Sequence, residues 1–416
     1  MKVAVICKSD TNGGAAVVSR RLIAALRSEG VDATMLVADR PGACADGLPV
    51  VEARYPLLKP AAFMAERLQI FMAEGGSLRN LFKLDTARFG LPLWRHPVVR
   101  ESDAVILNWF NQGMLSLNGV RCIAGLGKRV IWTMHDMWPL TGICHHAMDC
   151  RRYTASCGCC PYLGAHAGPG DLSHKVWKKK DGLYRDTGIT FVAVSSWLAE
   201  KARESSLLAG QRVEVIPNAI NPLTINRPGP DDGKRRILFS AATLDNWIKG
   251  LDTFREAIEI FASRNPEEAS SCEVVLMGSV KDPASLEEFA IPARHLGMVT
   301  GEERIAGIYS GADVTVNTSS FENLPGTLVE AQAYGSVPVA FDRGGQRDII
   351  AHGATGYLAE WSDEPRLRAA AIADGIAVAL RMKEERGEEL KAAMRSSVED
   401  KFSYRAVARS YLSLLL

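Results

Sequence analysis

The sequence lacks several features that would assign it at once to a class of protein. No apolar run approaches the roughly eighteen residues that a transmembrane helix needs. Lysine plus arginine (49) nearly equal aspartate plus glutamate (48), for a net charge of +1. A dedicated nucleic-acid-binding protein carries a basic excess, so we expect no nucleic-acid partner. The first apolar stretch soon reaches Lys8 and is too short for a signal peptide, which predicts a cytoplasmic protein.

What is present is 416 residues of average globular composition, enough for two or three domains at about 100–200 residues each. Short continuous apolar runs alternate with helical patterns, which is typical of a parallel sheet covered on both faces. The predicted strands lie at 3–7, 33–37, 104–107, 130–134 and 190–194, and then at 236–240, 273–277, 314–318 and 337–341. Between the two series, prolines and asparagines at 217–222 and a polar loop at 228–233 indicate a linker. We therefore expect two doubly wound α/β domains with a hinge near Asn218.

Two segments of the first series stand where a sheet can bind ligands. Gly13 and Gly14 lie between a strand and a helix, where free backbone amides attract an anion. A plain strand-to-helix turn is an equally good interpretation, because the loop lacks both G-x-G-x-x-G and G-x-x-x-x-G-K-[ST]. His135 directly follows strand 130–134, and open α/β sheets bind ligands beyond the carboxyl ends of strands. The alternative for His135 is a structural histidine.

The most informative segment follows strand 314–318. Glu322 and Glu330 stand on either side of Pro325 and Gly326, whose turn offers free amides to a phosphate. Carboxylates at this spacing, taken alone, are more often a solvated helix face.

These residues match the motifs of a known family, in the same order along the chain. The matching segments are the hinge Val215 to Asn218, Lys249-Gly250, the E-x7-E pair Glu322 and Glu330, the run from Glu330 to Val339, and the D-x-G-G-x-x-D-I stretch Asp342 to Ile349. On these five motifs the chain resembles the retaining GT-B glycosyltransferases of family 4 over nearly its whole length.

The resemblance implies two Rossmann-like domains that face each other across a cleft. The last helix of that fold crosses back, so the acceptor-side domain would comprise residues 1–218 and 399–416 and the nucleotide-sugar domain residues 219–398. The implied reaction moves a hexose from a UDP- or GDP-sugar to a glycan or lipid-linked glycan acceptor in polysaccharide or lipopolysaccharide biosynthesis. It would retain the anomeric configuration by front-face displacement and require no cofactor.

The resemblance also implies residue roles. His135 would contact the transferred sugar, Lys249 would neutralise the leaving diphosphate, and Glu322 would hold the sugar hydroxyls. Glu330 would accept hydrogen bonds from the ribose of the nucleotide, and the nucleobase would lie near Met298. The full implied donor-binding set is Gly13, Gly14, Lys249, Met298, Val299, Asn323, Leu324, Pro325, Gly326 and Glu330.

One departure from the family pattern concerns the diphosphate. Many members carry an arginine a few residues before the lysine, whereas this chain has Ser240 to Leu244 there. Arg304 or Arg347 are the candidates to replace it. The missing arginine also supports the alternative function, a catalytically impaired nucleotide-sugar-binding protein of the same fold. A glycogen- or sucrose-type synthase fits less well because the chain is short, and a hydrolase with paired carboxylates fits less well because of the glycines and Lys249.

Five of the nine cysteines fall between residues 144 and 160. In a reducing compartment such a cluster indicates metal binding or buried thiols before disulfides. The hypothesis is a structural zinc held by Cys144, Cys150, Cys157 and Cys160. His145 or His146 are substitute ligands, and buried or reversibly oxidised thiols are the alternative. A similar cysteine stretch occurs in a subgroup of the family.

Two further segments raise a membrane hypothesis. Residues 52–100 interleave aromatic and basic side chains, and residues 175–180 carry four lysines around Trp177. Such patches suit an anionic lipid surface, which would place the protein at the inner face of the cytoplasmic membrane. The alternative is a set of amphipathic helices packed on the sheet, with solvated lysines.

Overall fold

The computed structural model describes residues 1–11, 13–40, 47–220, 232–286 and 289–416. Within them the chain divides into two compact units, Met1–Ala219 with Val407–Leu416, and Ile220–Ala406. Residue 399, where the sequence-based division returns to the first domain, lies inside a helix that continues to Phe402. Asn12, Cys44 and the 228–231 part of the predicted polar loop lie outside the described residues.

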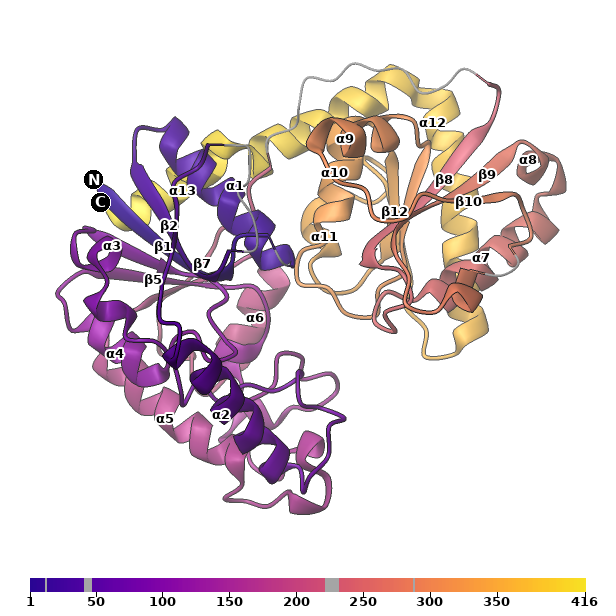
Figure 1. Ribbon diagram of the computed structural model, residues 1–416. Coiled ribbons are helices and arrows are strands. Elements are labelled where there is room, and N and C mark those ends of the chain that lie inside the picture. The colour runs from indigo at the N-terminus through magenta and orange to yellow at the C-terminus, as the bar shows by residue number, and fades with distance from the viewer. Residues whose placement is uncertain (12, 41–46, 221–231, 287–288) are drawn as a thin grey trace. The chain divides into compact units, whose positions relative to one another are not determined.

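A sheet of parallel strands forms the centre of the first unit (Figure 1), in the order β3-β2-β1-β4-β5-β6-β7. The strands are β1 Lys2–Ser9, β2 Asp32–Asp39, β3 Val50–Glu52, β4 Ala104–Leu107, β5 Arg129–Met134, β6 Thr190–Ala193 and β7 Val213–Val215. Because the strands are parallel, their carboxyl ends meet at one edge, where ligands of such sheets bind.

The helices of this unit are α1 Gly14–Ser28, α2 Leu58–Ala73, α3 Pro97–Arg100, α4 Leu117–Ala124, α5 Leu172–Asp186, α6 Ser196–Glu204 and α13 Tyr404–Leu415, with 3-10 turns η1 Leu93–Arg95, η2 Trp138–Leu140, η3 Arg152–Thr154 and η4 Pro161–His166. Helix α5 begins where the Asp171 carboxylate accepts from the amides of Ser173 and His174 at 2.9 and 3.3 Å, as expected of an N-cap. No helix in the described ranges is long and apolar enough to cross a bilayer.

The end of the chain is bound to the first sheet. The buried Tyr411 hydroxyl of α13 lies 2.8 Å from Thr133 Oγ1 of β5, and the Arg129 guanidinium donates to the Leu414 carbonyl at 3.3 Å. The C-terminal helix α13 therefore belongs to the first unit, and Figure 1 draws both chain ends there.

The second unit has its own parallel sheet, in the order β10-β9-β8-β11-β12-β13. Its strands are β8 Arg235–Thr243, β9 Cys272–Ser279, β10 Ala293–His295, β11 Val314–Asn317, β12 Val337–Phe341 and β13 Tyr357–Ala359. Its helices are α7 Leu251–Arg264, α8 Pro266–Ser270, α9 Glu302–Ser310, α10 Gly326–Tyr334, α11 Gln346–Ile349 and α12 Pro365–Phe402, with the 3-10 turn η5 Pro283–Leu286. Helix α12 is interrupted at Gly387, where φ is +32°.

Alternate residues of β8 explain why its sequence is continuously apolar. Ile237 and Phe239 belong to the buried cluster that includes α7 and α12 side chains, whereas Leu238 belongs to the cluster formed with α9 and α10. A strand buried on both faces has no polar side to alternate with. The prediction of two doubly wound α/β domains is therefore confirmed. The sequence missed β3, β7, β10 and β13, edge strands of three residues each, which are too short to show a period.

Candidate active site

Lys249 and Glu322 meet at the carboxyl edge of the second sheet. Lys249 follows β8 and Glu322 follows β11, which are neighbours in the sheet. Lys249 Nζ lies 2.5 Å from Glu322 Oε1, and the two side chains are 30% and 14% exposed. Two of the three predicted catalytic residues, 73 positions apart in the sequence, therefore form one partly buried ion pair.

The backbone at Lys249 is fixed by Thr318, the residue that directly follows β11. Thr318 Oγ1 lies 3.0 Å from the Lys249 carbonyl and 2.8 Å from that of Gly250. Gly250 has φ of +72°, and a Cβ there would stand 2.5 Å from the Thr318 carbonyl oxygen. Glycine after the lysine thus permits the close approach of the two loops.

The glutamate side is held by the loop after β12. The Gly345 amide donates to the Glu322 carbonyl at 3.1 Å. Gly344, at φ +68°, passes so close that a Cβ would stand 2.3 Å from the same oxygen. The K-G, E-x7-E and D-x-G-G segments are therefore one structure, in which two glycine-containing loops fix the backbone on either side of the ion pair.

Helix α10 supplies the remaining residues of the E-x7-E segment. Pro325 is its N-cap and Gly326 its first residue. The Leu328 amide donates to the Pro325 carbonyl at 3.1 Å, whereas the amides of Gly326 and Thr327 stand before the first carbonyl that an α-helix can offer them. Asn323 is buried and Leu324 packs against the core, which leaves the backbone rather than the Leu324 side chain to meet a ligand. Glu330 lies half-buried in the second turn of α10, whereas Glu322 lies in the loop before the helix.

Met298 and Val299 follow β10 and differ in exposure. Met298 is 57% exposed, whereas Val299 is buried in the core cluster of α9 and α10. Of these two side chains, only that of Met298 is exposed enough to contact a ligand at the carboxyl edge of the second sheet. The predicted donor-binding role of Val299 therefore depends on its backbone.

The two candidate replacements for the missing arginine are placed differently. Arg347 forms an ion pair with Asp342, and its Nη2 atom donates to Asp342 Oδ2 at 3.1 Å. Arg304 lies exposed on α9. Neither side chain joins the Lys249–Glu322 pair in this structure.

In the first unit, Gly13 and Gly14 lie exposed at the start of α1. Gly13 is the N-cap with φ of +86°, and a Cβ at either glycine would meet no atom of the described residues within 4 Å. With respect to those residues, the start of the helix is open to an approaching group.

His135 lies at the end of β5, and Asp136 after it anchors a buried polar network. Burial lowers the pKa of His135 to about 4, so its ring is neutral near pH 7. Asp136 accepts from His145 Nδ1 at 2.7 Å, from Trp109 Nε1 at 3.0 Å and from the Trp138 amide at 2.8 Å. The turn that carries His135 is therefore rigidly held.

The network continues to residues that sequence reasoning missed. His145 Nε2 lies 2.8 Å from Asp85 Oδ2, and the other Asp85 oxygen pairs with Arg67 of α2. Burial alone would lower the pKa of His145, but Asp136 and Asp85 outweigh it and raise the pKa to about 10. Asp85 and Arg67 lie in the basic-aromatic segment, and nothing in their spacing indicates a partner at His145.

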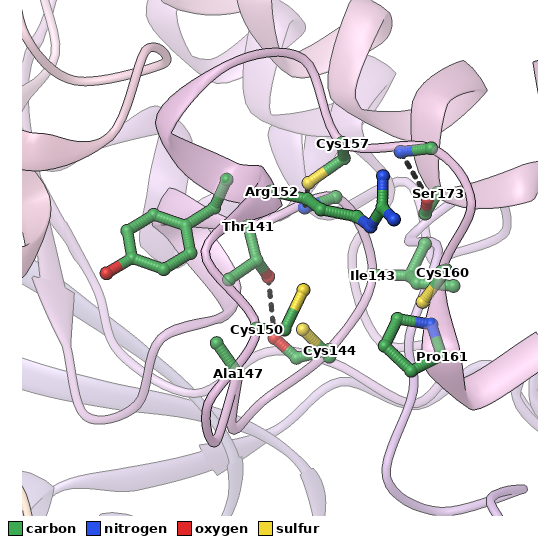
Figure 2. Close-up of a pocket in the computed structure, with 13 residues that line it drawn as sticks. Thr141, Ile143, Cys144, Ala147, Cys150, Arg152, Cys157, Cys160, Pro161 and Ser173 are labelled. Carbon is green, nitrogen blue, oxygen red and sulfur yellow. Dashed lines mark hydrogen bonds between the residues drawn. The ribbon is translucent and has the colours of Figure 1, made fainter. Parts of the chain in front are cut away.

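The four cysteines predicted to bind zinc line one small cavity, shown in Figure 2. Cys159, the fifth member of the cluster, does not line it. All four are free thiols.

Sequence comparisons identify the family. The model of Glycosyltransferase Family 4 matches residues 12–222, and that of Glycosyl transferases group 1 matches residues 234–377. Two curated relatives match in part. The putative colanic acid biosynthesis glycosyl transferase WcaC of Escherichia coli is 29% identical over 99 residues, which is 23% of this chain and 24% of WcaC. The D-inositol 3-phosphate glycosyltransferase of Thermobispora bispora is 28% identical over 183 residues, which is 39% of this chain and 42% of that protein.

Solved structures of similar fold cover the whole chain. HepE of Anabaena, in complex with UDP and glucose, aligns over 100% of this chain and 99% of its own at 14% identity, with a TM-score of 0.63. WaaG, a glycosyltransferase involved in lipopolysaccharide biosynthesis, aligns over 99% of both chains at 12% identity and a TM-score of 0.63. Trehalose-6-phosphate synthase OtsA covers 100% of this chain and 99% of its own at 12% identity, with a TM-score of 0.65. Together with the family match over half of its length, these likenesses show that the chain belongs to glycosyltransferase family 4 and has the GT-B fold.

Proposed function

We propose that this protein is a retaining glycosyltransferase that moves a hexose from a UDP- or GDP-sugar to a glycan or lipid-linked glycan acceptor. The observation that carries the proposal is the Lys249–Glu322 ion pair at the carboxyl edge of the second sheet, with the open first turn of α10 beside it in the sequence. A cation, free amides and a carboxylate at one sheet edge suit a phosphate and a sugar.

In the proposed reaction, the bond between the anomeric carbon and the diphosphate oxygen breaks as the acceptor oxygen bonds to the same face of that carbon. The acceptor proton passes to the leaving phosphate. The Lys249 ammonium stabilises the charge that develops on the diphosphate, and the Glu322 carboxylate accepts hydrogen bonds from the sugar hydroxyls. We also propose that His135, whose ring is neutral near pH 7, contacts the transferred sugar.

Names and ligands of the relatives support the class of substrate. HepE has been solved with UDP and glucose and with UDP-glucose. WcaC is named for colanic acid biosynthesis and WaaG for lipopolysaccharide biosynthesis. On this basis we propose a cell-surface polysaccharide or lipopolysaccharide intermediate as the acceptor.

The test compares wild type with Glu322→Gln across UDP-, GDP- and ADP-sugars, with nucleotide release as the readout. Glu303→Gln, an exposed glutamate at the start of α9, is the matched control. We expect one donor to be consumed by wild type and by the control, and about 10²–10³-fold more slowly by Glu322→Gln. Tight binding of a donor with equal background release in all three proteins would instead support the alternative, a nucleotide-sugar-binding protein, which the pairing of Arg347 with Asp342 favours.

We further propose that α2 binds an anionic membrane surface. Its buried face carries Glu66 and Arg67, whereas Met64, Leu68 and Met72 on the opposite face are 62%, 54% and 63% exposed. Ala62 and Ile70 are also buried, so α2 has apolar residues on both faces, whereas the exposed face of a surface helix is usually polar. Apolar residues continue outward at Leu57, Leu58, Leu78 and Phe82, all exposed. Exposed Arg54 and Arg79 lie just before and just after α2 in the sequence, and their charge suits lipid headgroups of negative charge.

The other basic residues contribute less than the sequence suggested. Lys59 is paired with Asp39 at 2.8 Å, and Arg67 with Asp85. In the 175–180 segment, Val176 and Lys180 are buried in α5, whereas Lys175, Lys178 and Lys179 remain exposed. The membrane proposal therefore rests on the exposed apolar face of α2.

Flotation with phosphatidylglycerol-containing vesicles at low salt tests this proposal. Wild type should float, and the double variant Met64→Ser with Leu68→Ser should remain with the soluble fraction. Leu367→Ser, an equally exposed leucine of α12 in the second unit, is the control and should float. The proposal fails if wild type stays unbound or if the α2 variant floats as well as the control.

A further inference from the structure

The cysteine cavity has room for an occupant of atomic size. Its volume is about 20 Å³, and a single water-sized sphere needs about 10–15 Å³ on the same measure. Cys144, Cys150, Cys157 and Cys160 come from separate turns of the 141–171 loop, and Figure 2 shows their sulfur atoms around this hollow. Cys159 and His146 are not among the lining residues. Four of the five clustered cysteines therefore line the cavity.

His145 is excluded as a substitute ligand by its hydrogen bonds. Asp136 occupies its Nδ1 and Asp85 its Nε2, so neither ring nitrogen can donate a lone pair to a metal. The inner set is then composed of sulfur alone, and four thiolates in a closed site are typical of structural zinc.

A buried cation lies beside the cavity. Lys180 of α5 is 0% exposed, and its ammonium donates to the carbonyl oxygens of Trp138 and Thr141 and lies 3.4 Å from the centre of the Trp138 ring. A buried charge of this kind is costly unless an opposite charge is close. Zinc with four thiolates carries two negative charges, which would compensate the Lys180 charge.

The loop backbone also favours thiolates. The Gly142 amide donates to Cys157 Sγ at 3.2 Å, and Cys157, Gly158 and Cys159 have φ values of +50°, +98° and +45°. Three successive left-handed residues, two of them not glycine, need compensating interactions to persist.

We propose that Cys144, Cys150, Cys157 and Cys160 bind one structural Zn²⁺, with Lys180 as the buried counter-charge. Within the described residues, no three or more His, Cys, Asp or Glu side chains stand close enough together to hold a metal ion as they are. Binding therefore requires the four sulfurs to turn inward, and four thiol protons leave as Zn²⁺ enters. The metal would tie the loop to α5 and to the His135 turn, from which the cysteine segment follows directly.

The decisive experiment uses the whole protein, purified without chelator. We expect about one zinc per chain by plasma mass spectrometry, and after exchange to Co²⁺ the visible absorption of a tetrahedral thiolate complex. Less than about a tenth of an equivalent after incubation with zinc, together with no such Co²⁺ absorption, overturns the proposal. Recovery of the four cavity cysteines as disulfides overturns it as well.

Variants test which residues carry the site, with folding checked by circular dichroism. Cys150→Ser and Cys160→Ser should lose the stoichiometric zinc, whereas Cys159→Ser, adjacent in the sequence but outside the cavity, should keep it. Lys180→Met should weaken zinc binding about 10-fold or more, and Lys179→Met, exposed on the same helix, should not. Zinc retained by both cavity variants, or lost equally by Cys159→Ser, contradicts the ligand set. Equal zinc affinity of the two lysine variants contradicts the counter-charge.

Discussion

Gly344→Ala perturbs the candidate active site without changing any of its side chains. Gly344 and Gly353 have nearly the same backbone conformation, with φ of +68° and +74°. They differ in the space around them, because an added Cβ would stand 2.3 Å from the Glu322 carbonyl oxygen at Gly344 and would meet nothing within 4 Å at Gly353. The pair therefore separates backbone strain from displacement of Glu322.

Strain alone gives the smaller effect. Alanine in the left-handed region costs about 1–2 kcal/mol, so Gly353→Ala should lower the free energy of unfolding by that amount. At Gly344 the same strain applies, and the overlap adds about 1–3 kcal/mol. For a unit of this size, 1 kcal/mol corresponds to about 2–4 °C in melting temperature, and thermal unfolding should resolve the two variants.

Activity provides the second readout. Moving the new Cβ from 2.3 Å to ordinary contact distance requires a shift of about 1 Å in the Glu322 backbone, and misplacement of that size can lower the rate about 10²-fold. We expect kcat/KM for the donor to fall accordingly in Gly344→Ala and to be unchanged in Gly353→Ala. If the two variants unfold at the same temperature and are equally active, the close approach of Gly344 to Glu322 has no functional consequence and the reasoning is refuted.

Two further predictions concern the first unit. Tyr411→Phe removes the 2.8 Å hydrogen bond that joins α13 to Thr133 and should cost about 0.5–1.5 kcal/mol in urea denaturation; an unchanged midpoint would mean that packing alone holds the helix. Burial lowers the pKa of His135 to about 4, whereas an unfolded histidine titrates near 6.5. Between these values the unfolded chain binds a proton that the folded chain does not, so stability falls as the pH falls. His135→Gln should lose less stability than wild type over that interval, and parallel losses in denaturation curves at several pH values would contradict the assignment.

The sequence patterns located most helices and strands, because the apolar periodicity and turn residues that define these elements act over a few neighbouring positions. Strand 314–318 was predicted from its apolar run, and the structure places β11 at Val314–Asn317. Gly250, after Lys249, and Gly344, in the loop after β12, both have φ above zero and lie in close contact with another loop. Such requirements concern one residue and its immediate surroundings, so they are visible in the sequence.

Charge pairing was not visible in the same way. Arg67 belongs to a stretch that the sequence presents as a basic surface, but the fold buries it against Asp85. Lys180 ends a run of lysines and yet lies fully buried, while its neighbours on α5 face solvent. Whether a charged residue is solvated or paired depends on what packs against it.

The near balance of 49 basic and 48 acidic residues does not show which charges are paired and which are solvated. By itself the sequence determined the class of fold, two parallel α/β sheets, because apolar periodicity and turn residues act over a few positions. It also supplied the family motifs. Only the tertiary structure decided that Lys249 and Glu322 form a pair, that four particular cysteines share a cavity, and that Met64, Leu68 and Met72 of α2 are exposed. Those contacts join residues far apart in the chain, and their distances are set by how strands and loops pack in space.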